Sequence, residues 1–309
     1  MGGGALVVLG DALLDVDVDG QVHRSTPDAG VPVLDVTGET ARPGGAALAA
    51  ALLAGGDPAV TLVTALADDG KADRLRGLLA PALDLLAGQA TGGTPVKCRW
   101  LRDGRPLLRT DSGTGRPAPG LGAAGAALPE LLGAAGAVLV SDYGRGVAAD
   151  PAVRAALAGA LARGTPVVWD PHPKGPAPVA GVAVSTPNLA EARRAAGLPE
   201  GGPAASGAVL LDRWSCAAVA VTIGAAGAVL VRPDRGPLAV PAPEVTGGDP
   251  CGAGDAFAGA LALRLAAGSD LPAAVDAATT AAARFVGDGG AAAVRWTGRA
   301  WRQPAPVLP

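Results

Sequence analysis

Few residues in this sequence could bind a transition metal or cross-link the chain. The three cysteines, Cys98, Cys216 and Cys251, lie far apart without C-x-x-C spacing, and there are only two histidines, His23 and His172. An odd, scattered set of cysteines argues against a disulfide framework, and two separated histidines argue against a zinc centre. Any bound metal is therefore expected to have mainly oxygen ligands, and Cys98 and Cys216, in strand-like segments, are expected to be buried.

Two further absences exclude classes of partner. The formal net charge is −3 and no dense cluster of lysine and arginine occurs, so the attraction that dominates nucleic-acid binding is missing. No apolar run reaches the roughly 18 residues of a membrane span, and the N-terminal stretch MGGGALVVLGDALLD lacks the basic region of a secretion signal. The sequence predicts a cytoplasmic protein without a nucleic-acid or membrane partner.

Small apolar residues are abundant instead. The chain is 49% hydrophobic but only 3% aromatic, so its core must be built from alanine, valine and leucine. Apolar runs typical of buried strands begin near residues 5, 60, 137, 166 and 217, and helix-length segments lie at 68–80, 150–163 and 188–196. This alternation is typical of a parallel sheet covered on both faces. Two more helices are expected between residue 253 and about 286, the second with Asp270 as its N-cap.

Two segments interrupt the alternation. Residues 31–36 and 96–110 have the character of β-ribbon, with Asp103 and Gly104 at the turn of the second. We expect them to form a small sheet that projects from the main domain. The stretch at 114–125 is rich in proline and glycine and is predicted to be a loop.

The stretch GGDPCGAGDAFAGA, residues 247–260, places glycines and two aspartates directly before a helix. Glycine lets backbone N–H groups approach an anion closely, and a helix start adds its positive end. Such a loop could stabilise a phosphoryl group in transfer while Asp255 accepts a proton from an attacking hydroxyl. A glycine loop capped by Asp255, without chemistry, is the alternative that this stretch alone leaves open.

The same stretch resembles the C-terminal signature of the ribokinase-like (PfkB) carbohydrate kinases, D-x-T-G-A-G-D-x-F. The resemblance implies a catalytic base at Asp255 and an anion hole at Gly252, Ala253 and Gly254. Asp249 matches the acidic residue that opens the signature and is implied to act on a metal through water or phosphate. Cys251 departs from the pattern because threonine is usual there, and a thiol is a weaker hydrogen-bond partner.

Three further motifs follow in the family's order. ARPGGAALAAALLAGG, residues 41–56, resembles the N-terminal signature, which implies that Gly44 and Gly45 approach the sugar, although the family's asparagine is Leu48 here. STPNLAEA resembles the T-x-N-x-x-E segment, and VTIGAAGAVLV resembles the strand–G-x-x-G–strand segment. Each motif alone would also fit an ordinary turn or helix cap. The implied nucleotide and metal residues are Asn188, Glu191, Thr222, Gly224 and Gly227.

A narrower resemblance concerns the substrate. RSTPDAGVPV, TPVKCRWLRDGRPLLRT and SDYGRGV are similar to segments of the bacterial heptose 7-phosphate kinase domains, which implies a phosphosugar acceptor. Such an acceptor requires fixed cations, and Lys97 and Arg99, two apart on a strand, could face one phosphate together. Solvated charges on an exposed ribbon are the alternative. The implied acceptor-site residues are Asp11, Asp15, Gly44, Gly45, Lys97, Arg99, Arg109 and Asp142.

The segment WDPHPKG ends a strand at the carboxyl edge, where ligands of open α/β sheets bind. It resembles the D-P-K-G of the heptose kinases with two extra residues, which implies a nucleotide phosphate contact for Lys174. His172 is expected to be a loop residue, since Asp255 already fills the role of base. Asp17 and Asp19 are expected at the surface.

These observations predict an α/β fold: one ribokinase-like three-layer α/β/α domain over residues 1–309, with a mostly parallel central sheet and a β lid from about 16–40 and 95–111. The implied activity is transfer of the γ-phosphoryl group of ATP to a sugar hydroxyl, most specifically O1 of a heptose 7-phosphate. Mg²⁺ would be held through Asn188, Glu191 and Asp249, and a monovalent-cation requirement is left open.

Some alternatives remain open at this point. The acceptor could instead be a fructose phosphate, ribose or a nucleoside, or the chain could be a catalytically silent sugar-binding protein of the same fold. Lid strands of this family often pair between subunits, so the resemblance implies a homodimer.

Overall fold

A ten-stranded sheet forms the centre of the computed structural model, which describes residues 4–55, 58–233, 235–298 and 300–303. The strand order is β14-β13-β12-β11-β10-β9-β1-β4-β5-β8, and the strands from β12 through β5 run parallel to one another. The parallel strands are β1 (Leu6–Gly10), β4 (Val60–Leu66), β5 (Asp84–Thr91), β9 (Ala137–Ser141), β10 (Val167–Asp170), β11 (Val184–Ser185) and β12 (Val219–Thr222). The outer strands β8 (Arg116–Pro117), β13 (Ala228–Val231) and β14 (Leu238–Val240) pair antiparallel.

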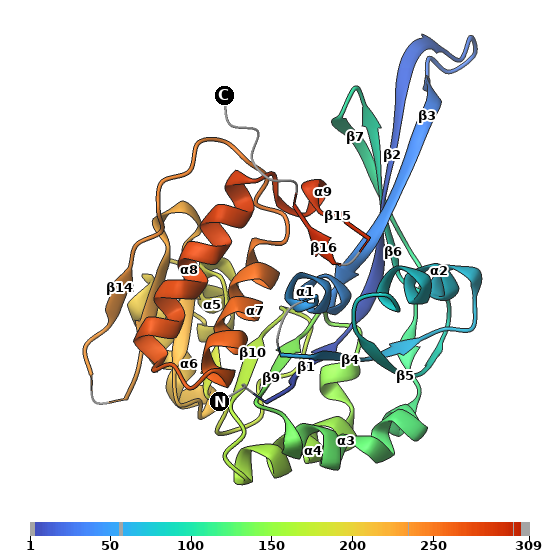
Figure 1. Cartoon of the computed structure of the whole chain (residues 1–309). Coiled ribbons are helices and arrows are strands. Elements are labelled where there is room, and N and C mark those ends of the chain that lie inside the picture. Colours follow the sequence, from blue (N-terminus) through green and yellow to red (C-terminus); the bar gives the residue numbers. More distant parts are fainter. Residues whose placement is uncertain (1–3, 56–57, 234, 299, 304–309) are drawn as a thin grey trace.

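Helices cover both faces of this sheet and complete the predicted three layers (Figure 1). Leu6 and Val8 of β1 pack into one core cluster, whereas Val7 and Leu9 pack into the other, as the alternation of side chains along a strand requires. The first face is covered by α1 (Ala46–Leu53), α2 (Gly70–Leu79), α7 (Ala253–Ala266), α8 (Leu271–Gly287) and α9 (Gly290–Ala293). The second face is covered by α3 (Ala123–Ala134), α4 (Pro151–Ala162), α5 (Leu189–Ala196) and α6 (Pro203–Trp214).

Local signals account for most of these helices. Asp150 and Asp270 cap α4 and α8 with their carboxylates, and Asn188 with Glu191 forms a capping box at α5. The loop predicted at 114–125 is wrong in part, because it contains β8, a 3₁₀ turn and the start of α3. That helix begins after a glycine with no side-chain cap, so nothing local marks its start.

A second sheet of four strands, in the order β3-β2-β6-β7, rises from the carboxyl edge of the central sheet (Figure 1). We call it the lid: β2 (Ala12–Ser25), β3 (Pro32–Gly45), β6 (Val96–Arg102) and β7 (Arg105–Ser112). Because β2 starts two residues after β1 ends, the lid continues the central strand. Asp103 and Gly104, with φ of 49° and 74°, form the predicted turn between β6 and β7.

The prediction for Asp17 is wrong. Its carboxylate is buried in the lid and accepts hydrogen bonds from Arg42 Nη1 at 2.7 Å and from Arg99 Nε at 2.8 Å. The register places Arg99 opposite Asp17, so both side chains lie on the same face of the lid sheet.

Several smaller elements complete the fold. Cys216 is buried as predicted, whereas Cys98 in the lid is only partly buried.

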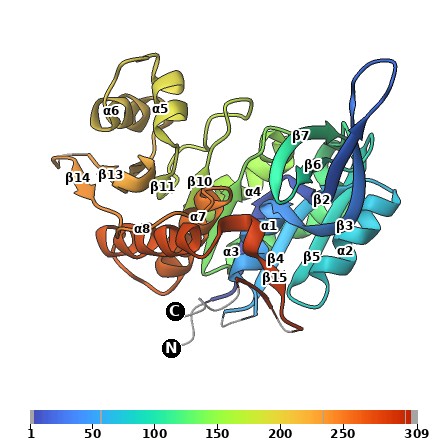
Figure 2. The same ribbon diagram turned by 90° about the horizontal axis from the view of Figure 1, so that it is seen from above.

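Figure 2 shows the lid at one end of the molecule and β13, β14, α5 and α6 at the other. Within the described ranges, no helix has the length and apolar character to cross a membrane. The remaining elements are the 3₁₀ turns η1 (Pro119–Leu121), η2 (Val147–Ala149) and η3 (Gly224–Ala226) and the strand pair β15 (Arg295–Trp296) and β16 (Trp301–Arg302).

Candidate active site

Two adjoining pockets lie at the carboxyl ends of the central strands. Strands β4, β5 and β8 lie on one side of β1, and β9 to β14 lie on the other, so the strand order reverses at β1. Ligands of open α/β sheets bind at the carboxyl ends of the strands beside such a reversal. The two pockets share Tyr143, Gly252 and Asp255. The lid pocket is lined by these and by Asp15, Gly45, Leu48, Lys97, Arg99, Arg109 and Cys251. The edge pocket is lined by the shared residues and by Asp142, Asp170, Pro171, His172, Thr186, Asn188, Glu191, Thr222 and Gly254.

Asp255 stands in the first turn of α7, at the boundary between the two pockets. One carboxylate oxygen, Oδ2, accepts a hydrogen bond from the Tyr143 hydroxyl at 2.8 Å, while Oδ1 is buried without a partner among the described residues. Burial, and then the charge of Asp15, raise the pKa of Asp255 to about 7, although the Tyr143 hydrogen bond lowers it. A carboxyl with this pKa can accept a proton at neutral pH, as a general base must.

The glycine loop before Asp255 leaves backbone donors free. Gly252 has a φ of 84° and precedes α7, so its position favours glycine. Ala253 N–H donates to the Pro250 carbonyl at 3.1 Å, whereas the N–H groups of Gly252, Gly254 and Asp255 have no protein acceptor in the part of the chain that the structure describes. Free N–H groups at the start of a 14-residue helix form an anion site.

The three cations predicted for the acceptor site meet in the lid pocket. Lys97 Nζ lies 4.8 Å from the centre of the Tyr143 ring. Arg99 is ion-paired with Asp17, and Arg109 makes two hydrogen bonds, of 2.7 and 2.6 Å, with Asp111. All three residues line the lid pocket; Lys97 and Arg99 are partly buried, whereas the Arg109 side chain is 55% exposed.

Asp15 also lines the lid pocket. Burial raises its pKa to about 6, although the positive charges of Lys97 and Arg99 lower it. The predicted glycines lie beside it. A Cβ atom at Gly44 would lie 2.5 Å from Asp15 Oδ2, and one at Gly45, whose φ is 61°, would lie 2.5 Å from the Asp11 carbonyl oxygen. Only glycine therefore fits where the lid meets α1.

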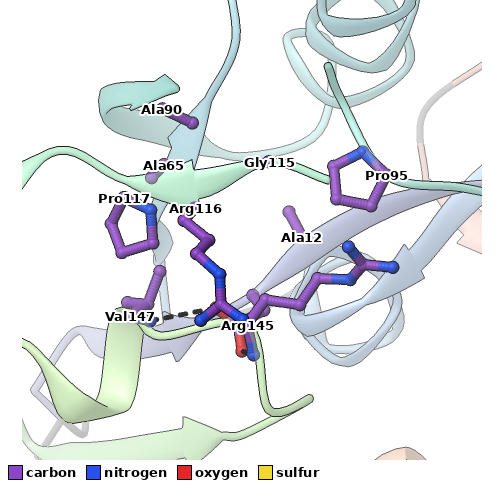
Figure 3. A pocket seen from close by; sticks show the side chains of 10 residues that line it. Ala12, Ala65, Ala90, Pro95, Gly115, Arg116, Pro117, Arg145 and Val147 are labelled. Atoms are coloured by element: carbon purple, nitrogen blue, oxygen red, sulfur yellow. Dashed lines mark hydrogen bonds between the residues drawn. The ribbon is translucent and has the colours of Figure 1, made fainter. Parts of the chain in front are cut away.

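Asp11 makes structural contacts that the sequence did not predict. Its carboxylate is buried and accepts hydrogen bonds from the backbone N–H groups of Tyr143 at 3.1 Å, Arg145 at 2.9 Å and Val147 at 3.0 Å. It lies outside the lid pocket and lines a small pocket together with Arg116, Arg145 and Val147 (Figure 3). Asp11 therefore holds the 143–147 loop in place.

Asp142 likewise lies outside the lid pocket. It lines the edge pocket, its Oδ1 accepts from Gly144 N–H at 2.7 Å, and burial raises its pKa to about 6. The prediction that it contacts the acceptor stays a prediction.

The nucleotide residues predicted from the T-x-N-x-x-E segment meet in the edge pocket. Asn188 Oδ1 accepts from Glu191 N–H, and Glu191 Oε2 accepts from Asn188 N–H, each at 3.0 Å. Thr222, at the end of β12, forms an isolated backbone bridge with Asn188, and burial raises the pKa of Glu191. Both helix-cap residues thus present oxygen atoms to the same pocket as Gly254.

Some predicted residues do not line either pocket. Gly224 and Gly227 form the turn that follows Thr222, and Gly227, with a φ of 99°, approaches the Val240 carbonyl too closely for a side chain. Lys174 is exposed, and its N–H donates to His172 Nδ1 at 3.2 Å. The Asp249 carboxylate accepts from Cys251 N–H at 2.9 Å.

Sequence reasoning missed four residues of the site: Tyr143, Asp170, His172 and Thr186. Asp170 ends β10, where Thr186 Oγ1 donates to its Oδ1 at 2.9 Å, and burial and the charge of Asp255 raise its pKa well above the ordinary value. An acidic residue that ends an apolar strand was the signal that could have identified it.

The edge pocket suits a hard divalent cation. Its lining offers amide and carboxylate oxygens from Asn188 and Glu191, the ligand types that Mg²⁺ prefers, with further negative charge nearby. Among the described residues, no group of three or more histidine, cysteine, aspartate or glutamate side chains could hold a metal ion by itself. This composition fits a cation held jointly by the protein, water and phosphates.

Comparison with known proteins identifies the family. The pfkB family of carbohydrate kinases matches residues 121–297, more than half of the chain. The chain belongs to this family. It is a carbohydrate kinase, as the glycine loop and Asp255 predicted.

Curated relatives cover almost the whole chain. It is 48% identical over 295 residues to the bifunctional protein HldE of Streptomyces coelicolor, a match that covers 94% of this chain and 61% of the relative. It is 35% identical over 286 residues to HldE of Caulobacter vibrioides, covering 90% of this chain and 59% of that protein. The chain therefore spans about three fifths of the length of these relatives.

Solved structures confirm the predicted ribokinase-like fold. Ribokinase from Arabidopsis thaliana, complexed with ribose and ATP, superposes with a TM-score of 0.70 at 19% identity, over 92% of this chain and 93% of that one. The tetrameric inhibited form of phosphofructokinase-2 from Escherichia coli superposes with a TM-score of 0.71 at 16% identity, over 93% and 95% of the two chains. At these identities the likeness shows the fold alone.

Proposed function

We propose that this carbohydrate kinase transfers the γ-phosphoryl group of ATP to O1 of a heptose 7-phosphate. The observation that carries the proposal is the convergence of Lys97, Arg99 and Arg109 on a pocket that also contains Asp255. Three cations around one pocket suit an acceptor that already bears a phosphate. The resemblance of the lid ribbon and SDYGRGV to heptose 7-phosphate kinase domains supports the same acceptor.

The proposed arrangement places ATP in the edge pocket and the sugar phosphate in the lid pocket. Asp255, at their common boundary, takes the proton from the acceptor hydroxyl as its oxygen forms a bond to the γ-phosphorus. The bond from that phosphorus to the bridging oxygen breaks, and ADP leaves. The N–H groups of Gly252, Gly254 and Asp255 stabilise the charge on the phosphoryl oxygens during transfer.

Mg²⁺ at Asn188 and Glu191, with Asp249 acting through water or phosphate, would neutralise charge on the triphosphate. Thr222 and the Gly224–Gly227 turn support the nucleotide end of the pocket, and Lys174 approaches the phosphates from the loop after β10. In this arrangement the γ-phosphoryl group would lie next to Asp255.

The three cations differ in how freely they can meet the acceptor's phosphate. Arg99 is held by the buried carboxylate of Asp17, so it keeps that partner. The Arg109–Asp111 pair has side chains 55% and 49% exposed, and such pairs contribute at most about 1 kcal/mol, so a phosphate can displace Asp111. Lys97 has no ion pair among the described residues. We therefore propose Lys97 and Arg109 as the principal phosphate contacts.

The lid is also the proposed surface for a homodimer. Its edge strands expose Val36 on β3 and Leu107 and Leu108 on β7, with 55%, 49% and 59% of their surface accessible. Exposed apolar side chains on an unpaired sheet edge favour pairing with a second copy. Light scattering of the full chain, with Leu108→Glu as the interface variant, tests this; a monomer at micromolar concentration would contradict it.

The deciding experiment measures ATP turnover against sugars and sugar phosphates, with Asp255→Asn as the inactive control. We expect turnover with heptose 7-phosphate, and a higher KM without a matching loss of kcat in Lys97→Gln and Arg109→Gln. Turnover only with unphosphorylated sugars would refute the heptose phosphate, turnover with fructose 6-phosphate alone would change the acceptor, and no turnover with any acceptor would refute the kinase proposal.

A further inference from the structure

Tyr143 lines both pockets, and it lies far in the sequence from the glycine loop that precedes Asp255. Its hydroxyl donates to Asp255 Oδ2 at 2.8 Å, so it holds one of the two oxygens of the candidate base. The other oxygen, Oδ1, is buried with no partner in the described ranges. The tyrosine hydroxyl thus fixes the orientation of the Asp255 carboxylate at the boundary of the two pockets.

Three contacts hold Tyr143, one to its backbone and two to its ring. Its own backbone N–H donates to the buried Asp11 carboxylate at 3.1 Å. The His172 ring, from the loop after β10, stacks against it with centroids 6.4 Å apart and planes at 21°. Lys97 Nζ, from lid strand β6, lies 4.8 Å from the ring centre, within the range of a cation–π contact. The ring therefore touches the central sheet and the lid at once.

We infer that Tyr143 is a positioning residue, whose hydroxyl orients the Asp255 carboxylate toward the acceptor and whose ring links that carboxylate to the lid through Lys97. The part of this inference that concerns turnover rests on the proposed function. The hydrogen bond and the ring contacts themselves do not depend on it.

A direct role for Tyr143 as proton acceptor is excluded by its surroundings. Removal of the hydroxyl from water, followed by the charge of Asp255, raises the pKa of Tyr143 well above its ordinary value, so the hydroxyl remains a donor. The charged and titratable groups that face the pair are Asp15 from β2, Lys97 from β6, Asp142 and Arg145 from the loop after β9, Asp170 and His172 from β10 and its loop, and Cys251 before α7.

Tyr143 is the only tyrosine among the 309 residues, which allows a direct spectroscopic test. The full chain, labelled with [ζ-¹³C]tyrosine and free of ATP and sugar, should show one ζ-carbon resonance. We expect it to titrate between pH 5 and 9 with a midpoint near 7, because protonation of Asp255 changes the hydrogen bond. Asp255→Asn should abolish this titration, and His172→Asn should retain it.

A resonance that stays constant between pH 5 and 9, or one that titrates unchanged in Asp255→Asn, would overturn the link to Asp255. Loss of the titration in His172→Asn would assign it to the stacked imidazole and overturn the inference as well. None of these results requires turnover, so they stand apart from a failure of the proposed function.

Kinetics test the positioning role. A hydrogen bond to a carboxylate favours its charged form, so Tyr143→Phe should raise the pKa of Asp255 and move the acid limb of kcat/KM up by about one pH unit. At pH 7 this corresponds to a loss of activity of about fivefold, which approaches tenfold at lower pH and shrinks toward pH 9. The KM for ATP should not change.

The matched control removes a buried hydroxyl elsewhere. Thr279 Oγ1 donates to the Val275 carbonyl within α8 at 2.8 Å, and Thr279→Val should lower stability without moving the pH profile. A Tyr143→Phe variant whose acid limb coincides with that of the wild type would overturn the positioning role. So would an equal loss of activity at every pH from 6 to 9, because that result describes general damage to the site.

Discussion

Asp17 neutralises two arginines inside the lid, and its replacement by asparagine should destabilise the whole protein. The Arg42 side chain is 1% exposed, and its Nε and Nη2 atoms have no hydrogen-bond partner in the described part of the chain. Asp17 supplies the 2.7 Å ion pair to Arg42 and a 2.8 Å pair to Arg99. Asp17→Asn keeps the shape of the side chain but removes its charge, so a buried guanidinium loses its counter-ion.

The expected loss is large for a single substitution. Removal of one partner from a buried ion pair costs about 3–5 kcal/mol, since the remaining charge stays in a medium of low dielectric constant. An unfolding entropy of about 2.1 cal/mol/K per residue gives roughly 0.65 kcal/mol/K for 309 residues. The melting temperature of Asp17→Asn should therefore be about 5–8 °C below that of the wild type.

Differential scanning calorimetry of the two proteins at pH 7 measures this difference. Asp111→Asn is the matched control, because it breaks the exposed pair with Arg109 on the same sheet, which should cost less than about 1 kcal/mol and less than about 2 °C. Equal melting temperatures for Asp17→Asn and the wild type would refute the reasoning that burial makes this pair essential. A drop as large in Asp111→Asn would refute the distinction between the two pairs.

Three further substitutions have expected outcomes. Asp255→Asn should abolish turnover yet raise the melting temperature, and the rise should be larger at pH 8 than at pH 5. The pKa of Asp255 is about 7 in the folded state against the ordinary 3.8, so the wild type loses stability as the pH rises from 3.8 to 7. Equal gains at both pH values would contradict this. Asp11→Asn leaves one acceptor oxygen for three backbone N–H groups and should cost about 1–3 kcal/mol in urea unfolding; unchanged stability would be the contrary result. Cys251→Thr should retain turnover. Burial raises the pKa of the Cys251 thiol, which therefore stays protonated and is a poor nucleophile. Inactivation would show that the thiol is needed.

Features with local causes were predictable from the sequence. The apolar strands, the caps at Asp150, Asn188 and Asp270 and the turn at Asp103 all depend on residues within a few positions of each other, and each occurs in the structure. The glycine loop before Asp255 belongs to the same class, because left-handed backbone and a helix start are properties of consecutive residues.

Features that depend on distant pairs were not predictable. Asp11 was expected to contact the sugar, yet its partners lie 132 to 136 residues further along the chain. Asp17 was expected at the surface because alternation along one strand does not show that Arg42 and Arg99 cover it. The hydrogen bond from Tyr143 to Asp255 spans 112 residues, and no spacing in the sequence indicates it.

The sequence by itself therefore determined the chemistry available to this protein: a carboxylate next to free backbone amides, oxygen donors at a helix cap, and cations on a ribbon. It did so because each of these groups is defined by residue type and short-range backbone geometry. The tertiary structure alone decided which carboxylate remains available. Burial raises the pKa of Asp255 and leaves one of its oxygens unpartnered, whereas the folded chain gives Asp11 three backbone donors and Asp17 two arginines. Desolvation and pairing depend on what surrounds a side chain, and only the packed fold brings those neighbours together.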